Sequence, residues 1–132
     1  MSWTTLSWRP TPVRTRPWSE ITRMYGEIWN PWTAHVWMKR LCEHIERAPY
    51  GGLIFGATSM HTLLVGQHET LEWMNDMLRV DPAQPHRITF SFHERAFVDP
   101  VVWACAPDAV IETFERFIRR VKWVSVHIES PP

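Results

Sequence analysis

The sequence has few cysteines, few lysines, no net charge and no long uninterrupted apolar segment. Its 132 residues carry 14 basic and 14 acidic side chains, so the formal net charge is zero. A balanced chain has no extended positive field to attract a polyanion, and we therefore expect no nucleic-acid partner. Apolar residues make up 45% of the chain, which is too many for intrinsic disorder. We expect a single folded domain over residues 1–132.

The two cysteines, Cys42 and Cys105, do not have the spacing of a disulfide framework. Residues 1–10 lack the basic start and the apolar core of a signal peptide, so we expect a cytoplasmic protein. The longest stretch without Asp, Glu, Lys or Arg, residues 48–68, is long enough to cross a bilayer. It is interrupted by glycines and polar residues, however, so it predicts a β-hairpin and no membrane contact.

Two helices are predicted in the N-terminal part of the chain. Apolar residues recur at helical spacing from Ser19 to Asn30, and Ser19 is a suitable N-cap. Asn30 and Pro31 form the start signal of a second helix, which the glycines at 51–52 end. One long helix kinked at Pro31 is the alternative. Before the helices, residues 1–17 combine prolines, arginines and tryptophans without an acid, which predicts an extended arm.

The spacing of apolar residues changes from the helical to the strand period after the glycine pair. The alternation is clearest from Arg87 to Glu94, with apolar side chains on one face and polar ones on the other, so we expect a one-sided sheet. Residues 69–74 are expected to form one helical turn. The predicted strands are residues 53–57, 61–65, 77–81, 87–94 and 101–105, with a short sixth strand at 123–128.

A strong amphipathic helix begins at Pro107 and Asp108. Its acidic residues come early and its basic residues late, as the helix dipole prefers. The sequence therefore predicts an α+β fold with N-terminal helices and an antiparallel sheet of five or six strands. The C-terminal helix packs on one face of that sheet, and its contact residues are expected to be Val110, Phe114, Phe117 and Val121.

Motifs for nucleotide or metal binding are incomplete. Residues 51–58 have the glycine spacing of a phosphate-binding loop, but Ala57 stands where the lysine must be. The His-Glu pairs at 68–69 and 93–94 lack the second histidine that a zinc protease needs one helical turn later. We therefore expect no cofactor and no metal. One improvised metal site stays open if its strands adjoin, and its ligands would be His61, His68, Glu69 and His93.

Tryptophan is the most unusual feature of the composition, with nine residues. Trp37 and Trp103 lie on predicted buried stripes, where we expect them to anchor packing. Indoles in loops and at helix starts are typical of protein-binding hot spots, although the N-terminal arm could instead fold back on the domain. The polar face of the central strands is a second candidate surface. The candidate partner-binding residues are Trp3, Trp8, Trp18 and Trp32, together with Arg79, Arg87, Ser91 and His93.

The leading hypothesis is a non-catalytic protein-binding domain. Bacterial toxin-neutralising immunity proteins and adaptors are small chains of this class, so a toxin is one candidate partner and a second copy of the chain is another. The alternative is a small enzyme or small-molecule binder with a pocket between sheet and helix. Cys105 precedes a helix start, which would lower the pKa of its thiol, but it fits equally well in the core. The catalytic residues of such an enzyme would be Cys105, His93, His61 and Glu94.

Overall fold

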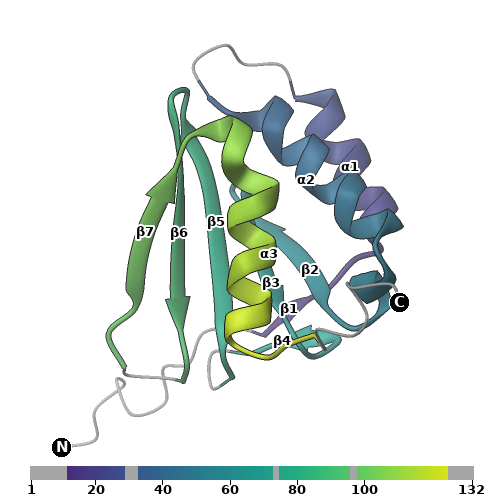
Figure 1. Cartoon of the computed structure of the whole chain (residues 1–132). Coiled ribbons are helices and arrows are strands. Elements are labelled where there is room, and N and C mark those ends of the chain that lie inside the picture. The colour runs from purple at the N-terminus through teal and green to yellow at the C-terminus, as the bar shows by residue number, and fades with distance from the viewer. Residues whose placement is uncertain (1–11, 29–32, 73–74, 96–97, 125–132) are drawn as a thin grey trace, which may run out of the picture.

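A five-stranded antiparallel sheet forms the centre of the molecule (Figure 1). The structure, a computed structural model, describes residues 12–28, 33–72, 75–95 and 98–124. The strands lie in the order β2-β3-β5-β6-β7, so β2 and β7 are its edges. The α+β prediction is confirmed. The strand bounds are β2 Phe55–Ser59, β3 Thr62–Gly66, β5 Met77–Gln84, β6 Arg87–His93 and β7 Val101–Cys105.

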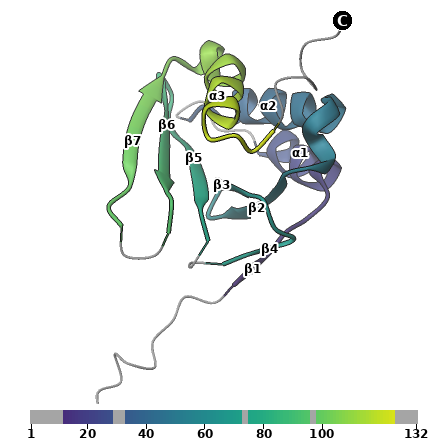
Figure 2. The same ribbon diagram turned by 60° about the horizontal axis from the view of Figure 1, so that its bottom comes forward.

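The helices cover one face of this sheet (Figure 2). α1 (Trp18–Glu27) and α2 (His35–Arg47) lie side by side over the β2 half, and α3 (Val110–Arg120) lies beside α2. Ile28 is extended, so α1 ends there and the described residues favour two helices over one kinked helix. The N-cap of α1 is Pro17, and Ser19 lies inside the helix, so its predicted capping role is wrong. The 3₁₀ turns η2 (Pro49–Gly52) and η3 (Pro107–Ala109) follow α2 and precede α3.

One large hydrophobic cluster lies between the helices and the sheet. It includes Leu41 and Ile45 of α2 and Phe114 of α3, all fully buried. Burying each such side chain stabilises the fold by about 1.5–3 kcal/mol. The predicted contacts of the C-terminal helix are confirmed at Val110, Phe114 and Phe117, whereas Val121 is only partly buried.

A second, smaller cluster lies on the opposite face of the sheet. Strands β1 (Val13–Arg14) and β4 (Thr70–Leu71) pair with each other and lie against that face. The expected helical turn at 69–74 is wrong within its described part, because Thr70 and Leu71 form a strand. The one-sided sheet is also wrong at this end, because β3 and β5 carry apolar residues on both faces. The cluster consists of Ala57, Leu64, Leu71 and Met77, with Val13 packed against it.

The β2–β3 hairpin turns later than predicted, at Met60 and His61. Both residues have positive φ, 49° and 71°, as a tight two-residue hairpin requires. The Tyr25 hydroxyl of α1 donates to the His61 carbonyl over 2.7 Å and holds the turn. Of the expected sixth strand at 123–128, Trp123 and Val124 form a bend and the rest lies outside the described residues. Within the described ranges, no helix is long and apolar enough to cross a membrane.

Candidate binding groove

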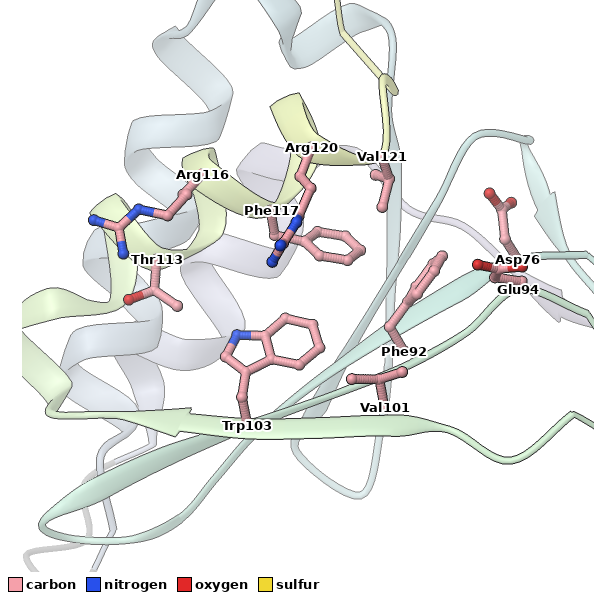
Figure 3. A pocket seen from close by; sticks show the side chains of 10 residues that line it. All are labelled: Asp76, Phe92, Glu94, Val101, Trp103, Thr113, Arg116, Phe117, Arg120 and Val121. Atoms are coloured by element: carbon pink, nitrogen blue, oxygen red, sulfur yellow. The ribbon is translucent and has the colours of Figure 1, made fainter.

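A groove of about 910 Å³ lies between α3 and the last two strands of the sheet (Figure 3). β7 leads through η3 directly into α3, so the helix runs back across the sheet beside the strand that precedes it. The groove's lining residues from the sheet side are Phe92 within β6, Glu94 just after β6, Val101 and Trp103 of β7, and Asp76 before β5. From the helix side they are Thr113, Arg116, Phe117 and Arg120 of α3 and Val121 just after it.

The position of α3 explains why the groove exists. Glu115 on α3 accepts hydrogen bonds from His44 Nε2 of α2 over 2.6 Å and from the Tyr50 hydroxyl over 2.8 Å. Burial raises the pKa of Glu115, but the hydrogen bonds from His44 and Tyr50 lower it more, so its pKa lies below the usual value. These bonds hold α3 against α2, on the side away from β7. The face of β7 beside the helix is therefore covered only in part, and Val101 is left exposed.

Packed aromatic rings form the floor of the groove. Trp103 stacks on Phe90, with ring centroids 5.4 Å apart, and also contacts Phe117 at 5.4 Å. Phe92 meets Phe117 edge to face at 4.9 Å, and Trp123 packs against both. Aromatic rings in such contacts have little rotamer freedom left to lose, so an apolar ligand group would meet a preformed surface.

Charges of opposite sign lie at opposite ends of the groove. Arg120 descends from α3 toward Trp103, whereas Asp76 and Glu94 lie together beyond Phe92 (Figure 3). Asp76 is fixed there, because its Oδ2 accepts from Trp123 Nε1 over 2.9 Å and from Gln67 Nε2 over 3.1 Å. The groove therefore has a basic end and an acidic end, separated by the aromatic floor.

β7 is the last strand of the described sheet. In the part of the chain that the structure describes, it pairs with β6 alone. Val101 and Val102 are 64% and 60% exposed, unusually high for adjacent valines in a strand. Edge strands are commonly protected by charged residues or by proline within the strand, and β7 contains neither.

The chain matches no protein-family model, no curated protein and no solved structure. Its groove must therefore be interpreted from its own residues.

Of the predicted partner-binding residues that the structure describes, those on β5 and β6 share the sheet face opposite the helices, whereas Trp18 does not. Trp18 lies in the core, where its indole N–H donates to the Ile54 carbonyl over 3.2 Å. His93 is buried, and burial and the nearby Arg79 lower its pKa. Arg79 and Arg87 are exposed and Ser91 is half-buried, all on the face opposite the helices. The remaining predicted residues, Trp3, Trp8 and Trp32, lie outside the described part of the chain.

The residues of the enzyme hypothesis are not brought together. Cys105 packs on the helix-covered face, and burial raises the pKa of its thiol despite a hydrogen bond with Thr113. His93 points to the other face of the sheet, and His61 is in the β2–β3 turn, against His35. Of the four, only Glu94 lines the groove. No group of three or more histidine, cysteine or acidic side chains could hold a metal among the described residues, so the improvised site is not assembled there.

Sequence reasoning missed the groove because its residues appear as ordinary core positions. Phe92, Trp103 and Phe117 all lie on apolar faces that the periodicity assigns to packing. The one available signal was chain order. In an antiparallel meander the last strand is often an edge, and a half-covered aromatic residue there faces a gap beside the helix.

Proposed function

We propose that this chain is a non-catalytic protein-binding domain that takes an extended segment of its partner along β7, in the groove beside α3. The observation that carries the proposal is that a strand edge with which no described segment pairs lies beside an aromatic groove. Protein domains recognise peptides in this way when the peptide adds a strand to a sheet edge and places alternate side chains in a pocket.

Each part of this arrangement supports a step of such binding. The free edge of β7 supplies backbone donors and acceptors, and these give affinity without depending on the partner's sequence. Val101 and Trp103 face the groove from alternate positions of β7, so the facing side chains of an added strand enter it. The lining residues include no histidine and no cysteine, so the cysteine and histidines of the enzyme alternative lie outside this groove.

The test uses selection from a phage-displayed library of random linear peptides against the whole chain. We expect enrichment of extended, apolar-containing peptides. A synthetic enriched peptide, titrated into ¹⁵N-labelled protein, should shift the backbone amides of β7 and α3 and leave those of α1 unchanged. A toxin remains one candidate source of the natural segment, and the selection does not depend on that identity.

Matched valine substitutions locate the contact. Val101→Lys places a charge in the groove at an exposed position, so it should weaken peptide binding about tenfold, or 1.4 kcal/mol, with little loss of stability. Val36→Lys changes an exposed valine of α2 and should leave binding within about twofold. Absence of enrichment, or peptide shifts that map to the Arg79 face instead, would overturn the proposal.

A second copy of the chain is the competing occupant of the edge. Sedimentation velocity on the wild type and on Val101→Lys separates the two, and we expect a monomer in both cases. A wild-type dimer that Val101→Lys dissociates would assign β7 to self-association instead.

A further inference from the structure

We infer that the partner segment carries an acidic side chain next to an apolar one, and that Arg120 and the indole N–H of Trp103 bind this acid. The inference rests on the proposed function, because it names the chemistry of the segment that the groove would take. It concerns an acidic side chain within the segment, not the partner's terminal carboxylate.

Among the residues that the structure describes, Arg120 is a cation without an ion-pair partner. Arg16, His44 and Arg116 form ion pairs, with Glu20, Glu115 and Glu112 respectively. Arg120 forms none with any residue that the structure describes. Its side chain nevertheless lies over the groove, directed toward Trp103 (Figure 3). A guanidinium beside apolar walls is suited to a carboxylate, since it is weakly hydrated and presents several parallel donors.

The sequence of α3 adds to this preference for an anion. Arg116 and Arg120 are four residues apart, so like charges are neighbours on one helix face. Arg116 is neutralised by Glu112, with Nη2 and Oε1 2.7 Å apart, and points away from the aromatic floor (Figure 3). An acid bound at Arg120 would be attracted by its positive charge, whereas a basic ligand there would be repelled.

Trp103 supplies a second donor at the same end. Its indole N–H donates no hydrogen bond within the described part of the chain and is not buried out of reach of solvent. The indole nitrogen lies on the side of the ring toward Thr113, facing the space below Arg120 (Figure 3). An oxygen ligand there would accept from the indole and from the guanidinium together, which a hydrocarbon ligand cannot do.

The rest of the groove sets the order of side chains along the segment. Phe92, Phe117 and Val101 offer an apolar site beside the two donors. Asp76 and Glu94 lie beyond it and repel an acid at that end. The structure therefore favours a segment whose acid lies toward the Thr113 end of β7 and whose apolar residue lies on the aromatic floor.

The experiment uses a groove-binding peptide from the selection and its variants. Each Glu or Asp of the peptide is replaced by Gln or Asn, and the C-terminus is amidated in a separate variant. Affinities are measured by isothermal titration for the wild type, Arg120→Gln, Trp103→Phe and the control Arg23→Gln, an exposed arginine of α1. Each variant is first checked by its thermal unfolding.

We expect one acid-to-amide change in the peptide and Arg120→Gln each to weaken binding about tenfold, with little further loss when combined. Trp103→Phe keeps an aromatic ring but is smaller and removes the N–H, so it should cost about threefold more for the acidic peptide than for its amide variant. Arg23→Gln should leave affinity within about twofold, and added salt should weaken only the acidic peptide.

Contrary outcomes separate this inference from the proposed function. If peptides occupy the groove but no acid replacement matters, or Arg120→Gln weakens both peptides equally, the acid inference fails and strand addition stands. A loss on amidation alone would assign Arg120 to a terminal carboxylate and overturn the inference as stated. If no peptide binds in the groove at all, the proposed function itself fails.

Discussion

The two edges of the same sheet are treated in opposite ways. At β2, the chain before α1 returns to the edge, and the Arg16 amide donates to the Gly56 carbonyl over 2.9 Å. The Trp18 ring lies on Gly56, and its indole N–H binds the Ile54 carbonyl. At β7 no described segment pairs with the outer edge. Its two exposed valines also lack the charge that commonly keeps an edge strand from pairing with another chain.

The two edges differ in whether their backbone groups are bound by other described segments of the chain. At β2, the Arg16 amide and the Trp18 indole N–H bind the Gly56 and Ile54 carbonyls, and Gly56 leaves space for the Trp18 ring. Satisfied backbone groups cannot pair with an unwanted strand. Among the described residues, no such hydrogen bond is formed at the outer edge of β7. Here Glu115 holds α3 against α2 instead. An edge with which no described segment pairs, beside an aromatic groove, is what the proposed strand addition requires.

The largest effect is expected from breaking the closed edge. A Cβ at Gly56 would lie 2.5 Å from Cη2 and 2.8 Å from Cζ3 of Trp18. The indole is rigid and its N–H is held by Ile54, so the ring cannot move aside without losing that bond. We expect Gly56→Ala to lower the free energy of unfolding by about 1–3 kcal/mol, measured by urea denaturation.

Two controls test the cause. Gly52→Ala adds a methyl group where nothing lies within 4 Å, so it should change stability by no more than about 0.5 kcal/mol. Trp18→Leu in the Gly56→Ala background removes the clashing ring, so the double variant should lose less than the sum of the single losses. Strict additivity would show that the close approach of Trp18 is not what Gly56 is needed for.

The second prediction concerns the residue that holds α3 away from β7. Glu115→Gln keeps the shape but removes the charge that accepts from His44 and Tyr50, and should cost about 1–2 kcal/mol near neutral pH. The pKa of Glu115 is lowered in the folded state, so its stabilisation is present above the unfolded value of 4.5 and is lost as pH falls through the folded pKa. The difference between wild type and variant should therefore shrink on acidification.

Glu112→Gln is the matched control on the same helix. Its carboxylate is exposed and pairs with Arg116 across one helical turn, so its loss should cost no more than about 0.5 kcal/mol. Urea titrations of all three proteins between about pH 7 and pH 3 provide the comparison. If the loss in Glu115→Gln stayed constant down to the lowest pH, the ionised carboxylate would not be what holds α3 to α2.

Local patterns in the sequence sufficed for the elements that pack along one face. The C-terminal helix and the strand at 101–105 follow directly from apolar spacing, and both lie where expected. Pairings between distant segments left no local signal. Neither the two-residue strands β1 and β4 nor the bridge from Arg16 to Gly56 has enough residues to show a period.

The candidate site was harder to predict for a related reason. A period shows which face of a strand is apolar, but not whether a helix covers that face completely. Trp103 was expected to anchor packing and does so against Phe90, yet part of its ring also lines the groove. Trp18 shows the reverse case, because a helix start looks exposed in sequence until a glycine on a neighbouring strand gives its ring a place to pack.

The smallest expected effect tests whether the β7 edge is open in solution. Val102→Thr replaces a methyl group by a hydroxyl at an exposed position, and should change stability by no more than about 0.5 kcal/mol. The same substitution at Val80, fully buried in β5, should cost about 1–2 kcal/mol because the hydroxyl loses water. Both losses are measured by urea denaturation. If the two were equal, Val102 would be buried in the folded protein, and the β7 end of the sheet would not be exposed as it is in the structure.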